Sequence, residues 1–311
     1  MHSSISNFNP RHGPRMNAAV LAFFASCIVV FFGFVGATEW LIRDQVLPQD
    51  TLGAHSRLLN TSQVSDAAFG DSHAARGFNA SDGFINLAYP SENIHDMAVK
   101  AMSYFSDHAP GRIILQADPH LFAPYRVNSR HKIDNDVPNL HIRSVRHRSR
   151  AFAYWETFLR NGGHLESKVT VTDFGSLLSS GDLSAVPPRK RLLDAQIRRT
   201  WHTIRETEHV ETARREYAAL IDWLVEKGAR LCLVSYPVSE DYAAAMASAT
   251  SSAGHEEEIA FFKNQAARVG AHYWDARAAV RNRGFFRDVD HLNSEGATRF
   301  SPDLLKACFG D

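Results

Sequence analysis

The sequence predicts an α/β fold in which helices cover both faces of a parallel sheet, preceded by one transmembrane helix. The sheet is predicted because short apolar runs alternate along the chain with segments of helical periodicity. Continuously apolar runs are typical of parallel strands that are buried on both faces. The transmembrane helix is predicted by residues 17–37, an uncharged apolar run of about the length needed to cross a bilayer.

The composition allows one large α/β domain or two small ones in 311 residues, 44% of which are hydrophobic. Basic and acidic residues are equal in number, 34 of each, so net charge does not indicate a class of partner. Three cysteines are too few for a disulfide framework. We expect Cys232 and Cys308 to be free, because buried free cysteines are common, with a bridge between them as the alternative.

The residues around the apolar run predict where the chain lies. Arg11 and Arg15 precede the run and favour a cytoplasmic segment over residues 1–16. Residues 17–37 are then a single-pass anchor in membrane lipid and residues 38–63 a tether, and the remainder is exported to the periplasm or the cell surface. A cleaved signal peptide is the alternative; we favour the uncleaved anchor because the apolar run is long for such a peptide.

The predicted domain covers residues 64–311. Its middle, residues 126–205, does not fit the alternation and is predicted as a basic insertion over one end of the sheet. Residues 126–150 hold seven lysines or arginines, which favours either a solvated segment or a surface for an anionic polymer or lipid headgroups. No module typical of nucleic-acid-binding proteins is present. Strands are expected at 66–70, 83–88, 112–117 and 231–236, and helices at 91–106, 211–227, 256–269 and 297–309.

A Gly-Asp-Ser-His tetrapeptide, residues 70–73, follows the first predicted strand. Ligands collect at the carboxyl ends of parallel strands, and the glycine permits a tight turn there. Ser72 then lies at the start of the next helix, where its backbone N–H can stabilise an oxyanion. A helix cap is the alternative role for this serine. Candidate substrate-binding residues are Asp71 and His73 beside it, and Arg143, Arg146 and Arg148 of the basic segment.

An Asp-Val-Asp-His tetrapeptide, residues 288–291, lies near the C-terminus. Asp288 and His291 share one face of a helical turn, so the carboxylate can hold one ring nitrogen while the other faces a serine. Asp290 is adjacent to His291 and is expected to point elsewhere. A nucleophile, a base and an orienting acid are what covalent acyl transfer requires.

A metal site is the alternative use of the same residues. Asp288, Asp290 and His291 would then ligate a cation together with His95 or His120. No spacing typical of metal-binding motifs supports this alternative. We therefore predict neither a metal nor a cofactor.

The Gly-Asp-Ser after the first strand and the Asp-x-x-His near the C-terminus resemble the SGNH/GDSL hydrolase family. The resemblance covers about residues 64–311, apart from the insertion. It implies a flavodoxin-like, three-layer α/β/α fold. It also implies that Ser72 is the nucleophile, His291 the base and Asp288 its partner.

Three features make the chain most similar to membrane-tethered members of that family: the anchor, residues 86–90 and residues 235–238. Those members include proteins of alginate O-acetylation and the D-alanyl transfer protein of teichoic acid synthesis. The resemblance implies an acylated envelope polysaccharide, or a similar anionic polymer, as substrate. It further implies a membrane-bound O-acyltransferase as a partner.

Two departures from the family pattern concern the oxyanion hole. The second block usually offers a glycine N–H, and here the backbone of Ser91 takes that place. The third block usually offers an asparagine; residues 117–120 contain none, so His120 is the candidate donor beside the amide of Ser72. The sequence thus predicts an esterase or O-acyltransferase acting on acyl, commonly acetyl, esters. A non-catalytic polymer-binding partner of an acyltransferase is the second hypothesis, and a metal-dependent hydrolase the third.

Overall fold

The structure is a computed structural model of the whole chain, and it divides into two compact units. The first consists of Met1–Val46 and Ser144–Leu165, and the second of Leu47–Arg143 and Glu166–Asp311. Each unit is treated by itself below. The residues that the structure describes are 18–46, 55, 58–81, 83–128, 148–165, 169–247 and 249–310.

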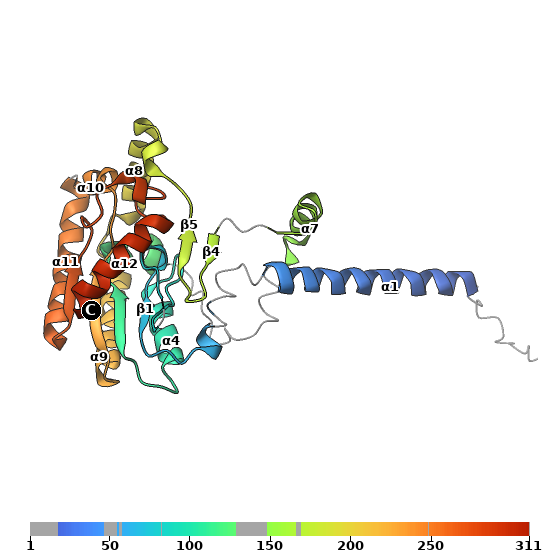
Figure 1. Cartoon of the computed structure of the whole chain (residues 1–311), viewed down its shortest axis with the longest axis horizontal. Coiled ribbons are helices and arrows are strands. Elements are labelled where there is room, and N and C mark those ends of the chain that lie inside the picture. The colour runs from blue at the N-terminus through green and yellow to red at the C-terminus, as the bar shows by residue number, and fades with distance from the viewer. Residues whose placement is uncertain are drawn as a thin grey trace, which may run out of the picture. The chain divides into compact units, whose positions relative to one another are not determined.

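The first unit is a pair of helices (Figure 1). Helix α1 covers Ala18–Leu41 and continues as a π-helical turn over Ile42–Val46. It is the one helix among the described residues that is long and apolar enough to cross a membrane, as the sequence predicts. The helix continues past residue 37, where the apolar run ends, because Thr38 to Leu41 are compatible with helix although less apolar. The short helix α7, Ala151–Arg160, packs against it.

The second unit contains a five-stranded sheet with the order β2-β1-β3-β6-β7, in which every neighbouring pair is parallel. This confirms the predicted α/β class. Numbered along the sheet, the order is 2-1-3-4-5, which is that of flavodoxin-like folds. The strands are β1 Ala67–Phe69, β2 Ile85–Asn86, β3 Arg112–Gln116, β6 Arg230–Ser235 and β7 His272–Asp275.

Helices cover both faces of this sheet (Figure 1). Alternate strand residues face opposite layers, so Ala67 and Phe69 belong to one apolar core and Ala68 to the other. One face is covered by α4 (Ile94–Tyr104), α9 (Glu208–Glu226) and α11 (Ala249–Val269). The other is covered by α3 (Ser72–Gly77), α8 (Pro188–His202), α10 (Glu240–Met246) and α12 (Ser294–Phe309).

The segment predicted as an insertion is only partly described, because residues 129–147 and 166–168 lie outside the described ranges. Its C-terminal part belongs to the second unit, where α8 packs against α10. The remaining short elements are β4 (Val169–Val171) and β5 (Leu177–Ser179), which form an antiparallel pair, α5 (Pro124–Val127), and the 3-10 turns η2 (Pro119–Phe122), η3 (Leu183–Ala185) and η4 (Arg283–Phe285).

Cys232 and Cys308 form a disulfide with an S–S distance of 2.06 Å, so the expectation of two free thiols is wrong. Cys232 lies on β6, which neighbours the central strand β3, and faces the layer that contains α12. Packing of that helix brings the two Cα atoms to 5.5 Å, a usual separation for a disulfide. The sequence does not reveal this proximity, because it depends on how α12 closes over the sheet. Cys27 of α1 is free and exposed.

Candidate active site

The tight turn between β1 and α3 positions the serine. A Cβ atom at position 70 would lie 2.6 Å from the Cβ of Gln116 and 2.7 Å from the Cβ of Ala74, so only glycine fits there. Asp71 caps α3 by accepting the backbone N–H of His73 at 2.9 Å. The capping role therefore belongs to Asp71 and not to Ser72. Ser72 is the first residue of α3 and is half-buried at the carboxyl edge of the sheet.

Folding brings Ser72, His291 and Asp288 into one line of hydrogen bonds. His291 Nε2 lies 2.9 Å from Ser72 Oγ, and His291 Nδ1 lies 2.8 Å from Asp288 Oδ1. When Nδ1 donates its proton to Asp288, Nε2 carries the lone pair that faces the serine hydroxyl. The parallel sheet makes this possible because the loop before α12 and the end of β1 both lie at the carboxyl edge.

The loop that carries His291 is folded by its own aspartate. Asp288 Oδ1 accepts the backbone N–H groups of Asp290 at 3.2 Å and of His291 at 3.1 Å, so one carboxylate oxygen organises the whole turn. Asn293 then caps α12 by accepting the N–H of Gly296 at 2.9 Å. The Asp288 side chain is 34% exposed, whereas that of His291 is 8% exposed.

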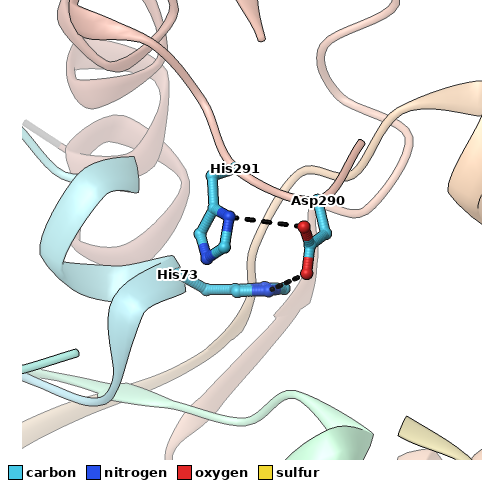
Figure 2. Close-up of side chains that lie close together, drawn as sticks. All are labelled: His73, Asp290 and His291. Carbon is cyan, nitrogen blue, oxygen red and sulfur yellow. Dashed lines mark ion pairs between the residues drawn. The ribbon is translucent and has the colours of Figure 1, made fainter. Parts of the chain in front are cut away.

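Asp290 does not point away from His291, so that expectation is wrong. One of its oxygens lies 3.3 Å from His291 Nδ1, and Figure 2 shows the carboxylate between His291 and His73. The prediction assumed a helical turn, but the loop is a bend in which the contacts of Asp288 turn Asp290 inward. Burial works to lower the pKa of His291, but Asp290 and Asp288 outweigh it and raise that pKa above its usual value.

The side chain of His73 is buried, but its ring forms part of the wall of the cavity described below, so its predicted role in substrate binding stays a prediction. Its side chain is 2% exposed, with Nδ1 at 3.4 Å from Asp118 Oδ2 and Nε2 at 3.5 Å from Asp290 Oδ2. Burial favours the neutral ring, but the two carboxylates outweigh it and raise the pKa of His73 to about 10. The two aspartates thus favour the protonated ring of His73.

Asp71 is likewise buried, and its predicted role in substrate binding stays a prediction. Its Oδ2 lies 2.9 Å from His120 Nε2 and 2.5 Å from Arg126 Nη2, and its Oδ1 accepts from Gln116 Nε2 at 2.9 Å. Burial works to raise the pKa of Asp71, but His120 and Arg126 hold it well below its usual value. The residue that precedes the serine is thus a fixed structural anion.

The buried groups around His73 balance in charge. The carboxylate of Asp71 pairs with the guanidinium group of Arg126, that of Asp290 lies 3.1 Å from Arg198 of α8, and that of Asp118 faces His73. A protonated His73 supplies the third positive charge. Burial lowers the pKa of the two other histidines of the cluster, His120 and His202, and keeps them neutral. We call these eight residues the buried cluster.

Two sets of side chains in this cluster are close enough to share a cation: His73, Asp290 and His291, and His73, Asp118 and His120. Both sets include His73, whose two ring nitrogens already face Asp118 and Asp290. The predicted alternative that included His95 is not assembled, because His95 lies on α4 at 3.5 Å from Glu216 of α9.

The predicted oxyanion donors differ in their surroundings. The backbone N–H of Ser72 makes no hydrogen bond within the described part of the chain, so it is free to donate. Ser91 lies exposed in the turn after β2, with a φ of 64°, and its role stays a prediction. His120 does not fit this role, because its ring is buried and its Nε2 is bonded to Asp71.

The three arginines predicted to bind substrate lie outside the site as described. Arg143 and Arg146 are beyond the described residues. Arg148 belongs to the first unit, where its guanidinium lies 3.1 Å from Glu39 of α1. A role for them in binding a polymer stays a prediction.

A cavity of about 410 Å³ opens at the carboxyl ends of β3, β6 and β7. His73 and His120 form part of its wall, together with Arg277 and Arg281. Neither Ser72 nor His291 is among the described residues that line it. This cavity therefore reaches the buried cluster and not the serine hydroxyl.

Only half of the buried cluster is named in the sequence analysis, and its members are not predicted there to meet. Asp290 is named, but its side chain is predicted to point away from His291. Asp118 is not among the predicted site residues, although its position directly after a predicted strand is a signal for the sheet's carboxyl edge. Arg198 and His202 come from α8, in the predicted insertion, and nothing in the local sequence connects them with residues 288–291.

Comparison with known proteins gives little further guidance. No family model matches the chain, and no curated protein matches it in sequence. Among solved structures, a carbohydrate acetylesterase family member from Sinorhizobium meliloti is similar over 79% of this chain and 100% of its own, with 9% identity and a TM-score of 0.33. Similarity at this level does not indicate a function, and the proposal below therefore depends on the side-chain geometry of the site.

Proposed function

We propose that the protein is a membrane-tethered serine esterase or O-acyltransferase that resembles the SGNH/GDSL hydrolases. Its substrates would be acyl esters, commonly acetyl esters, of a cell-envelope polysaccharide. The observation that carries the proposal is the unbroken line of hydrogen bonds from Ser72 through His291 to Asp288. The free N–H of Ser72 supports it as the first oxyanion donor.

In the proposed reaction, His291 Nε2 takes the proton of Ser72 as Oγ attacks the acyl carbon. Asp288 and Asp290 stabilise the imidazolium that forms, because both carboxylates contact Nδ1. The tetrahedral intermediate expels the sugar alkoxide, which takes the proton from His291 and leaves an acyl-serine. Water, or the hydroxyl of a second sugar, then gives its proton to His291 and attacks the acyl-serine; as the bond between the acyl carbon and Oγ breaks, His291 returns that proton to Ser72 Oγ.

The location follows from the proposed anchor and from the disulfide. Helix α1 is long and apolar enough to hold the chain in a membrane, and the basic residues before it favour a cytoplasmic N-terminus. The Cys232–Cys308 disulfide supports export of the second unit, because disulfides persist in oxidising compartments. A membrane-bound O-acyltransferase would be a fitting partner for such a domain.

The decisive variant is Ser72→Ala, assayed with p-nitrophenyl acetate and by mass spectrometry for an acyl-enzyme. We expect turnover to fall roughly a thousandfold or more, with loss of the acyl adduct, because no other group replaces the nucleophile. Ser103→Ala, on the exposed side of α4, is the matched control and should keep full activity. Unchanged turnover in Ser72→Ala would refute the assignment.

One observation favours a second candidate function, a non-catalytic partner that binds polymer. Beyond the amide of Ser72, the described residues show no built oxyanion donor, because His120 is bonded to Asp71. Polymer binding that survives Ser72→Ala, in a protein that forms no acyl adduct, would support this candidate. A metal-dependent hydrolase would instead lose its activity on treatment with a chelator.

A further inference from the structure

Helix α7 packs against the end of α1 through aromatic side chains. Trp155 donates its indole N–H to Thr38 Oγ1 at 3.0 Å, and its ring stacks on Phe34 with centroids 6.5 Å apart. Phe158 meets Trp40 edge to face at 6.1 Å. These contacts join the short helix to the last turns of the apolar one, within the first unit (Figure 1).

The apolar face of α7 is only partly covered by its contacts with α1 in the described structure. Phe152 is 82% exposed and Leu159 is 70% exposed. The two residues are seven apart, so they lie two turns from each other on one face of the helix. None of the residues of α7 is fully buried.

The position of α7 along α1 indicates what covers this face. The apolar run that spans residues 17–37 is about as long as the hydrocarbon core is thick, so its end lies near one membrane boundary. Phe34 is in the last turn of that run, and Phe152 lies beside it with ring centroids 6.3 Å apart. Trp40 and Trp155 occupy the level at which tryptophan is enriched in membrane proteins.

The charged residues of α7 suit the same boundary. Arg148 and Arg150 precede the helix and Arg160 ends it, so cations flank the apolar face at both ends. Basic residues beside an amphipathic helix are attracted to anionic headgroups. The sequence just before residue 148 is also rich in arginine and histidine.

We propose that α7 is an interfacial helix that lies on the bilayer beside α1, with Phe152 and Leu159 inserted among the lipid chains. The ligand class of this surface is a lipid bilayer that contains anionic headgroups. The chain would then contact the membrane twice, through its anchor and again through the segment between α5 and β4. The proposal rests on the tethered part of the proposed function and is independent of the serine chemistry.

The test places an environment-sensitive fluorophore on single cysteines of the full chain in vesicles of phosphatidylcholine and phosphatidylglycerol. In the unmodified chain only Cys27 is free, so its label reports whether α1 is inserted. In a Cys27→Ala background, Leu159→Cys reports the apolar face and leaves Phe152 intact. Thr157→Cys is the matched control, because Thr157 is exposed on the opposite side of the same helix.

We expect the label at 159 to emit at shorter wavelength than the label at 157. We also expect nitroxides placed at a shallow position on the lipid chains to quench it more strongly, and nitroxides deep in the bilayer to quench the label on Cys27. Quenching at Cys27 with identical behaviour at 157 and 159 would overturn the interfacial helix while leaving the anchor in place. A shift at 159 that requires native membrane proteins would identify a protein as the occupant and overturn the lipid assignment. None of these outcomes changes the Ser72→Ala test.

Discussion

The two sides of His291 differ sharply, although neighbouring residues build them. Ser72 and Asp288 form the open side, where the aspartate is 34% exposed. His73 and Asp290, one and two residues further along the chain, form the buried side, where both side chains are at most 2% exposed. On the open side, Ser72, His291 and Asp288 are joined by hydrogen bonds. On the buried side, His73 lies between the carboxylates of Asp118 and Asp290. The imidazole of His291 therefore contacts two carboxylates: that of Asp288, which solvent screens, and that of Asp290, which is buried.

This difference separates two tasks that a triad usually assigns to one acid. Asp288 accepts from His291 Nδ1 at 2.8 Å and sets the direction of the ring. Asp290 is further away, at 3.3 Å, but it is buried, so its charge acts through a medium of lower dielectric. We infer that Asp288 orients the base and that Asp290 sets how readily the base takes a proton.

The largest expected effect is on the open side. Asp288→Asn should lower kcat roughly a hundredfold to ten-thousandfold, because an amide at this place no longer holds the ring in the required tautomer. Stability should change little, since the side chain is partly in water. The measurement is steady-state turnover of p-nitrophenyl acetate, with circular dichroism to show that the fold is kept. Near-normal turnover would mean that Asp290 alone can orient His291.

The next effect is on the buried side and concerns stability. Asp290→Asn removes a buried negative charge that faces the buried His73 and the partly exposed Arg198, and leaving a buried cation without its partner costs roughly 3–5 kcal/mol. Chemical unfolding of the two asparagine variants should therefore show a much larger loss at 290 than at 288. Arg198→Gln, which removes one cation from the same carboxylate, should give a smaller loss of the same kind. Equal losses at 288 and 290 would contradict the comparison.

The open side was more predictable from sequence than the buried side. Ser72, Asp288 and His291 are found by local spacing, because each lies in a tetrapeptide whose residue types suit one reaction. The sheet was also predictable, since runs such as residues 112–117 are apolar throughout. The buried cluster was not, because Arg198 and His202 reach it only when α8 folds over the sheet. Long-range packing of this kind leaves no periodic signal in the chain.

A third prediction concerns how stability depends on pH. The pKa of His73 is about 10 in the folded protein, whereas its ordinary value, which applies to the unfolded chain, is 6.5. Between pH 6.5 and about 10 the folded state therefore keeps a proton that the unfolded state has released. The stabilisation is fully present below about pH 6.5 and is lost as the pH rises through about 10. The free energy of unfolding should therefore fall by up to about 1.4 kcal/mol per pH unit within this window.

His73→Gln should remove most of this slope, because glutamine does not titrate. Denaturant unfolding at several pH values between 7 and 9 measures it, with His95→Gln on the surface of α4 as the control. At the high end of the window the variant should approach the wild type in stability, since His73 is then losing its proton too. An unchanged slope in His73→Gln would show that another group holds the proton.

The smallest effect links the two sides through His291. Its pKa is raised chiefly by Asp290 against the opposing effect of burial, and the neutral ring is the form that acts as base. Asp290→Asn should therefore lower the pKa of His291 and move the acid limb of the kcat/KM profile to lower pH. Ser103→Ala should leave the limb in place. An acid limb that moves to higher pH, or stays unchanged while the variant remains folded, would show that the buried carboxylate does not tune the base.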